Sequence, residues 1–303
     1  MRFIPESIFD IIKLKGEIIM QIIKNYRNND TLRASFNRLT EKVFCFTFDG
    51  WYDKGFWNDK YIPYSLVEDG EVIANVSVNI VDINDYGTLR HYIQLGTVMT
   101  DEKYRNRGYI RILMNEIFKD YGEKVDGIYL FAGDDVKEFY PKFGFTAAKE
   151  YQYSKAVDTA CEKSIEAFPA DTPEKWQALE NAFDSNAFHG GYDMVNNFDL
   201  MMFHITGYMQ NSVYFDKQSG AYVVADVEND SLFIHMILSS TKVTIDDVVK
   251  MFGKDIKTVT LGFTPCDANG WNVKEYFEED CTLFLKDFSL DDKKIIFQTL
   301  SHA

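Results

Sequence analysis

Three of the chain's eight arginines lie within residues 104–111, and none follows that segment: Arg105, Arg107 and Arg111. An apolar run, residues 92–100, precedes the segment, and apolar residues at helical spacing follow it in residues 112–118. The pattern predicts a strand, a short basic loop with Gly108, and a helix. Since a helix N-terminus offers unpaired N–H groups and a positive dipole end, the loop could bind a polyphosphate. Gly108 would let the backbone approach a phosphate closely.

Taken alone, the basic loop is explained equally well as a solvated turn before a surface helix. A second motif, Phe139-Tyr140-x-x-x-Gly144-Phe145, follows about thirty residues later, after a predicted strand at 127–132. With Arg105-x-x-Gly108, it resembles the GNAT superfamily of N-acetyltransferases. The two motifs are similar to that family's pyrophosphate loop and helix-to-strand signature, and the resemblance covers roughly residues 20–153.

The resemblance implies a mixed sheet flanked by helices (an α+β or α/β fold), with acetyl-CoA as co-substrate and no metal. The family's roles fall on three sets of residues here. Backbone groups that hold pantetheine and the acetyl oxygen would be those of Val98, Met99 and Thr100. The pyrophosphate would bind Arg105, Asn106, Arg107, Gly108, Tyr109 and Ile110, with Arg111 behind them. Tyr140 would protonate the leaving CoA thiolate, which suits a phenol with a pKa of about 10.

The chain departs from the family pattern at three positions. Ile110 stands where the loop usually has a small residue, so the helix either sits further from the pyrophosphate or turns Ile110 away. Gly133 and Val136 replace a usual asparagine and alanine, which puts one polar contact to the pantetheine arm in doubt.

The general base that deprotonates the amine is not identified by the sequence. The candidates are Asp134, Asp135, His91, His189 in its His-Gly-Gly-Tyr loop, and the terminal carboxylate of Ala303. An aromatic cluster could attract a cationic acceptor or could simply fill a core: Trp51, Tyr52, Phe56, Trp57 and Tyr61.

The length of 303 residues predicts two domains. We expect a GNAT domain at 20–153, a polar linker at 154–170, and a degenerate GNAT-like α/β domain at 171–303. The second domain has neither an Arg-x-x-Gly loop nor a Tyr-x-x-x-Gly-Phe motif, so we expect it to bind no acetyl-CoA and to complete the acceptor pocket.

The predicted elements follow the GNAT order. In the first domain they are a helix at 30–45 capped by Asp30 or Thr31, strands at 61–67, 72–83 and 89–100, a helix at 107–121, a strand at 127–132, a helix at 134–141 and a strand near 145–153. In the second they are helices at 172–185 and 197–210, strands at 212–217, 220–227 and 231–239, a helix at 244–252, and strands near 257–263 and 281–287.

Residues 1–19 are expected to be a non-native extension. The end of that segment back-translates naturally to a purine-rich ribosome-binding sequence before the codon of Met20. The alternative is a genuine N-terminal helix. Intact-mass measurement on protein from the native organism separates the two.

The formal charge of −15 argues against nucleic acid as a partner, because phosphate binding needs a basic surface. No apolar run is long enough to span a bilayer. The four cysteines lie far apart and predict free, mostly buried thiols in the cytoplasm: Cys45, Cys161, Cys266 and Cys281. About −12 of the charge lies after residue 150, which either aids solubility or attracts cationic ligands.

We therefore expect an acetyl-CoA-dependent N-acetyltransferase for a small, cationic amine, with a homodimer left open. Two alternatives remain. One is an inactive acetyl-CoA-binding regulatory protein, and the other is a different acyl or aminoacyl transferase of tandem GNAT type.

Overall fold

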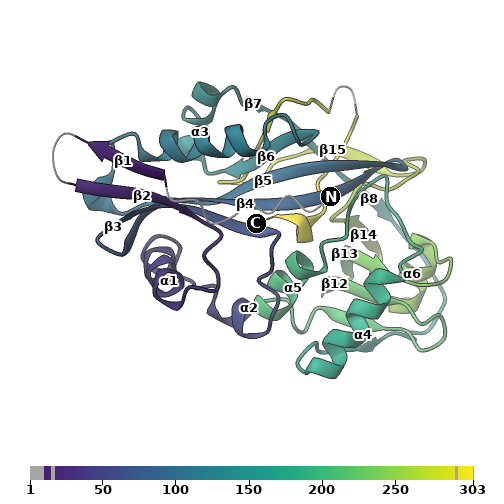
Figure 1. Cartoon of the computed structure of the whole chain (residues 1–303). Helices are drawn as coiled ribbons and strands as arrows, with labels where there is room; N and C mark the ends of the chain where they lie inside the picture. The colour runs from purple at the N-terminus through teal and green to yellow at the C-terminus, as the bar shows by residue number, and fades with distance from the viewer. Residues whose placement is uncertain (1–9, 15–17, 291–292, 303) are drawn as a thin grey trace.

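The computed structural model describes residues 10–14, 18–290 and 293–302, and its strands form two mixed sheets (Figure 1). The first sheet runs in the order β1 (Asp10–Leu14), β2 (Ile18–Lys24), β3 (Tyr61–Glu68), β4 (Glu71–Asp85), β5 (Thr88–Thr100), β6 (Gly127–Ala132), β16 (Thr282–Lys286) and β7 (Thr146–Ala147), with β10 (Tyr192–Val195) paired to β4. The second runs in the order β15 (Asn272–Tyr276), β8 (Glu150–Ala156), β14 (Thr258–Leu261), β13 (Ser231–Leu238), β12 (Tyr222–Glu228), β11 (Val213–Phe215) and β9 (Glu166–Ala167).

Helices cover both faces of the first sheet. Helix α3 (Tyr109–Tyr121) lies on one face, and α1 (Asp30–Phe44) and α2 (Asp49–Asp53) lie on the other (Figure 1). The remaining helices belong to the second half of the chain: α4 (Pro173–Asp184), α5 (Phe198–Gly207) and α6 (Ile245–Phe252). The mixed α/β class predicted from the sequence is confirmed.

Local sequence signals explain the limits of several elements. The Asn29 side chain accepts a hydrogen bond from the N–H of Leu32, so it caps α1 in place of the predicted Asp30 or Thr31. Asp69 and Gly70 both have positive φ, as a two-residue hairpin turn between β3 and β4 requires.

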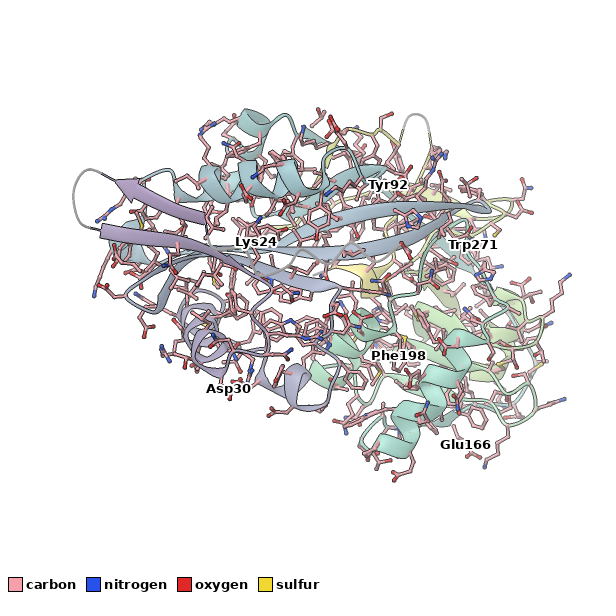
Figure 2. The ribbon with its side chains drawn as sticks, viewed as in Figure 1. Lys24, Asp30, Tyr92, Glu166, Phe198 and Trp271 are labelled. Atoms are coloured by element: carbon pink, nitrogen blue, oxygen red, sulfur yellow. The ribbon has the colours of Figure 1, made fainter. Side chains whose placement is uncertain are left out.

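A buried lysine fixes α3 to the sheet. Lys24 of β2 is 1% exposed, and its Nζ lies 2.7 Å from both Glu116 Oε1 and Asp120 Oδ2 of α3. Figure 2 labels Lys24 between the strands and this helix. Since an unpaired buried charge is strongly unfavourable, this pairing specifies which side of α3 faces the sheet.

Strand pairing connects the two predicted domains, and β8 itself spans the predicted boundary at 153. Strand β8 follows β7 directly but pairs with β14 and β15 of the second sheet. Strand β16, near the end of the chain, pairs with β6 and β7 of the first sheet. The division into two domains stays a prediction, and the sheets themselves exchange strands across it.

Several predicted elements are corrected. The helix expected at 134–141 is two short 3₁₀ helices, η2 (Asp134–Val136) and η3 (Tyr140–Phe143), because Pro141 cannot donate within a longer helix. The strand expected near 145–153 is split between β7 and β8. Asp10–Leu14 is a strand paired with β2, not the helix considered as the alternative for residues 1–19. Whether the native protein begins at Met20 stays untested.

Candidate functional site

The first sheet opens at one place, between two neighbouring parallel strands. Strands β5 and β6 pair only from Tyr92–Gly127 to Gln94–Tyr129, although β5 continues to Thr100. We call this opening the first fork. No strand in the described part of the chain pairs with the β6-facing edge of β5 beyond Gln94. The predicted backbone ligands Val98, Met99 and Thr100 lie on this edge.

A bulge turns β5 away from β6 at the fork. In the β4–β5 pairing, Thr97 and Val98 together oppose Val76, and Thr97 has a positive φ of 48°. Two buried side chains fix this conformation. Asn75 Nδ2 donates to the Thr97 carbonyl at 2.9 Å, and the Tyr61 hydroxyl lies 2.7 Å from Thr97 Oγ1.

The basic loop (residues 104–111) leads from β5 into α3, as the sequence predicts. Asn106 and Gly108 both have positive φ, and Gly108 is the N-cap of α3. A Cβ at Gly108 would meet no atom within 4 Å, so its φ of +79° is what favours glycine there, not crowding within the chain. Tyr104 anchors the loop through a hydrogen bond from its hydroxyl to Glu68.

The arginines of the loop are exposed and none forms a salt bridge with a described residue. Arg107 Nη2 donates to the Lys103 carbonyl at 2.8 Å, and the Arg111 guanidinium lies 5.0 Å from the centre of the Phe143 ring. Their charges are thus available to an anion at the N-terminus of α3. Ile110 packs against the core beneath α3, so its side chain is turned away from the loop surface.

Tyr140 lies at the start of η3, next to β16, the strand that the end of the chain contributes to the first sheet. Its ring is 5% exposed and lies 5.7 Å from that of Phe284 in β16. Burial, with the charge of Asp135 nearby, raises the pKa of Tyr140 to about 12. The phenol is therefore protonated at neutral pH.

The candidate bases are scattered. His91 is exposed, bonds to Asp82 at 2.7 Å, and lies at the end of β5 remote from the fork. His189 lines a pocket of the second sheet. Asp134 is exposed and pairs with Lys137, whereas the charge of Asp135 acts on Tyr140. Ala303 lies outside the described residues.

Sequence reasoning missed a buried polar row at the last rung before the fork. Tyr61, Asn79, Gln94 and Tyr129 lie side by side on β3, β4, β5 and β6. Among the described residues, neither Asn79 Oδ1 nor either polar atom of the Gln94 side chain has a hydrogen-bond partner. A signal was present, because polar residues occupy alternate positions within an apolar run: Asn75, Ser77 and Asn79.

A second missed group is His302, near the end of the chain. Its ring stacks on Phe131 of β6, with ring centres 3.8 Å apart. Burial, together with His204, lowers the pKa of His302 to about 3. His302 is thus a neutral imidazole that can accept a hydrogen bond but is a weak base.

The aromatic cluster fills a core. Trp51, Trp57 and Tyr61 are each at most 5% exposed, and Trp51 packs edge-on against Phe203 of α5 at 5.5 Å. Phe56 meets Trp176 of α4 at 5.6 Å. These rings join the two halves of the chain. Tyr52, the remaining member, is half-buried and already has the Arg33 guanidinium 3.7 Å from the centre of its ring.

The second sheet has its own fork, which the chain itself fills. The parallel strands β13 and β14 pair only as far as Ile234–Leu261, and β13 bulges at His235. Asn186 Oδ1 accepts the N–H of Ser239 at 2.9 Å, and the N–H of Ala187 donates to the Ser239 carbonyl at 2.7 Å. The backbone edge that stays free at the first fork is therefore occupied here.

The helix that follows the second fork also lacks an anion site. Helix α6 carries Asp246 and Asp247 in its first turn, and Asp247 accepts hydrogen bonds from the N–H and hydroxyl of Thr244 in a capping box. These carboxylates lie in the first turn of α6, where the first turn of α3 carries Arg111, so they would repel a pyrophosphate.

Comparison with known proteins agrees with this architecture. Residues 27–148 match the model of the acetyltransferase (GNAT) domain. The chain therefore carries a GNAT acetyltransferase domain, as the resemblance implied, and its two-sheet layout is compatible with a tandem arrangement. No curated protein matches the chain.

Solved structures share the fold at low sequence identity. A conserved protein of unknown function from Enterococcus faecalis V583 is 13% identical with a TM-score of 0.58, over 88% of this chain and 72% of that one. A GCN5-related N-acetyltransferase from Kribbella flavida is 12% identical (TM-score 0.53; 90% and 72% covered). Eis1 from Mycobacterium abscessus is 13% identical (TM-score 0.53; 92% and 73% covered).

Proposed function

We propose that this protein is an acetyl-CoA-dependent N-acetyltransferase that acts on a small amine. The observation that carries the proposal is the first fork, whose open β5 edge leads directly into the unpaired arginines before α3. Pantetheine would lie along Val98, Met99 and Thr100, and the pyrophosphate would lie at residues 105–111. The other sheet's fork is closed, which supports one acetyl-CoA per chain.

The acceptor would enter beside the buried polar row. The unpaired oxygens Asn79 Oδ1 and Gln94 Oε1 could accept hydrogen bonds from an amine's N–H groups, and a buried polar atom without a partner is unfavourable. Because the Gln94 Nε2 donor is unpaired as well, the row suits an acceptor molecule that both donates and accepts hydrogen bonds, as a neutral amine does. Of the two uses left open for the aromatic cluster, attraction of a cation and core packing, its burial favours core packing.

In the reaction, the amine nitrogen forms a bond to the thioester carbonyl carbon, and the C–S bond breaks. The N–H of Val98 would stabilise the oxyanion. The proton of the amine leaves to water, and the CoA thiolate takes a proton from the Tyr140 hydroxyl, which solvent then restores.

We further propose a cytoplasmic location, because all four cysteines are unpaired. Three of them are exposed, however, where burial was expected. No helix among the described residues is both long and apolar enough to cross a bilayer.

Release of free thiol from acetyl-CoA, followed across a panel of primary amines, tests the proposal. We expect turnover with at least one amine and none with the matched alcohols. Acetyl-CoA binding without thiol release on any amine would instead favour the regulatory alternative. Absence of acetyl-CoA binding would refute the proposal.

A further inference from the structure

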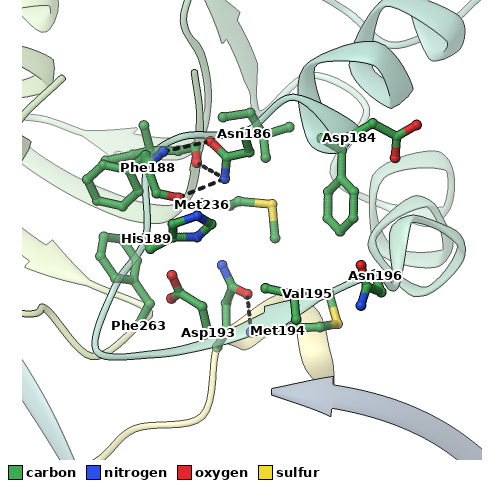
Figure 3. Close-up of a pocket in the computed structure, with 14 residues that line it drawn as sticks. Asp184, Asn186, Phe188, His189, Asp193, Met194, Val195, Asn196, Met236 and Phe263 are labelled. Atoms are coloured by element: carbon green, nitrogen blue, oxygen red, sulfur yellow. Dashed lines mark hydrogen bonds between the residues drawn. The ribbon is translucent and has the colours of Figure 1, made fainter. Parts of the chain in front are cut away.

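A cavity of about 280 Å³ remains at the second fork, beneath the loop that closes it. Its walls come from Met236, Ile237 and Leu238 of β13, from Phe263 just after β14, and from residues 183–196 (Figure 3). The volume is just below that of typical ligand pockets, which measure about 300–1,000 Å³, so only a small ligand would fit. The second sheet thus has a cavity at its fork, the position that corresponds to the opening in the first sheet.

This cavity is separate from the first fork. Met194 in its wall pairs with Ile83 of β4, and Ile83 pairs with Arg90 near the start of β5. The first fork opens only after Gln94, toward the other end of β5. A ligand in the cavity would therefore not occupy the acetyl-CoA site.

The cavity contains a buried carboxylate without a cation. Asp193 is 7% exposed, and its carboxylate accepts a hydrogen bond from the N–H of Gly190. Figure 3 shows that the carboxylate points toward His189, inside the cavity. Among the described residues, no lysine or arginine lines the cavity and none forms a salt bridge with Asp193. Burial raises the pKa of Asp193 to about 7, which reflects this missing positive charge.

The other walls suit an apolar or aromatic group. Phe188 and Phe263 meet edge to face with ring centres 5.8 Å apart, and Met194 and Met236 add thioethers. Aromatic faces attract cations. The exposed Asp184 side chain, although at the cavity's edge, points away from it (Figure 3). The charge of about −12 after residue 150 would raise the local concentration of cations.

We propose that this cavity binds a small organic cation, a primary ammonium on an aromatic or apolar arm. The ammonium pairs with Asp193, and the arm packs among Phe188, Phe263 and Met236. The cation supplies the charge and the hydrogen bonds that Asp193 lacks. This site goes beyond the proposed acetyl transfer and does not depend on it.

Calorimetric titration of the full chain with 2-phenylethylamine tests the proposal, with 2-phenylethanol as the neutral analogue. At pH 8, above the pKa of Asp193, we expect one amine per chain at the cavity and at least tenfold weaker binding of the alcohol. Asp193→Asn keeps an acceptor for the Gly190 N–H but removes the charge, so it should weaken amine binding at least tenfold. Val195→Trp should block the cavity from its half-buried rim. Asp267→Asn, the same change at an exposed acid outside the cavity, should leave the affinity unchanged.

The proposal would be overturned if the parent bound no amine, or if it bound the amine and the alcohol with equal affinity. Unchanged amine affinity in both Asp193→Asn and Val195→Trp would also overturn it. If Asp193→Asn does not fold, the rim variant and the alcohol comparison still decide. Because thiol release from acetyl-CoA is measured separately, failure of this site leaves the proposed acetyl transfer standing, and the reverse also holds.

Discussion

The three arginines of the basic loop have no acidic partner among the described residues, whereas each of the other described arginines pairs with a carboxylate: Arg27, Arg33, Arg38 and Arg90. We predict that replacing Arg105 and Arg107 together by Ala weakens acetyl-CoA binding by about 3–6 kcal/mol, since hydrogen bonds to charged groups contribute about 1.5–3 kcal/mol each. Both side chains are exposed, so the melting temperature should hardly change. Calorimetry measures the affinity. The matched control is Arg38→Ala, which removes an exposed arginine already paired with Glu71. Equal losses in the control and the double variant would contradict the assignment of the loop.

Tyr140 permits a test that separates chemistry from binding. Tyr140→Phe keeps the ring packed against Phe284 and removes only the proton donor. We expect kcat to fall by about 10²–10⁴-fold, with KM for acetyl-CoA roughly unchanged. Stability should change by about 1 kcal/mol or less. The fall should be smaller for acyl donors with a more acidic leaving thiol.

The control for Tyr140→Phe is Tyr86→Phe, which loses a hydroxyl at a tyrosine that is 50% exposed. Thermal melts of both variants accompany the kinetics. A Tyr140→Phe enzyme that turns over like the parent would make Tyr140 a packing residue, with water as the proton source.

At the scale of elements, most segments with a clear apolar pattern could be predicted from the sequence, including the short strands β6 and β16, and several short strands without such a pattern could not. Strands β4 and β5 and helix α3 lie within two residues of their predicted limits, because their apolar periodicity is strong. Strand β10 was missed because its sequence, Tyr-Asp-Met-Val, has no such pattern and it forms through its pairing with β4. The basic loop was found from charge and glycine spacing. The polar row at the fork was missed because its members come from four strands and meet only through the sheet register.

One buried carboxylate ties the exchanged strand β8 to the C-terminal segment. Glu150 is 6% exposed, and its Oε1 accepts the N–H of Phe297 at 2.9 Å. Burial raises the pKa of Glu150 from 4.5 to about 7. The folded chain therefore holds a proton that the unfolded chain releases, and this contribution to stability is lost as pH rises from about 4.5 through 7.

We predict that Glu150→Gln removes this part of the pH dependence. Between pH 5 and pH 8 the parent should lose up to about 3 kcal/mol that the variant keeps, so the variant gains relative stability at pH 8. Denaturant melts at both pH values measure the difference. The control, Glu166→Gln, changes an exposed carboxylate and should follow the parent. A Glu150→Gln variant with the parent's pH profile would show that Glu150 is ionised in the folded state.

At the scale of the whole molecule, the two sheets are not independent modules. Strand β16 lies between β6 and β7, and its Phe284 packs against Tyr140. Conversely, β8 belongs by sequence to the predicted GNAT domain but lies between β14 and β15 of the second sheet. The two-domain prediction from length followed the order of elements along the chain, and sequence order cannot reveal that strands are exchanged.

This exchange predicts that residues 20–153 alone will not form a stable domain. Without β16, strand β6 has an unpaired edge, β7 has no partner, and Tyr140 loses the ring against which it packs. The fragment should show no cooperative melt and no acetyl-CoA binding. By contrast, a protease site inserted near residue 160, in an exposed stretch without regular structure, should yield a cut chain whose pieces remain together. That cut protein should elute as one particle and bind acetyl-CoA like the parent. The prediction would be contradicted if the fragment of residues 20–153 melted cooperatively and bound acetyl-CoA with the parent's affinity. The first sheet would then be stable without β16.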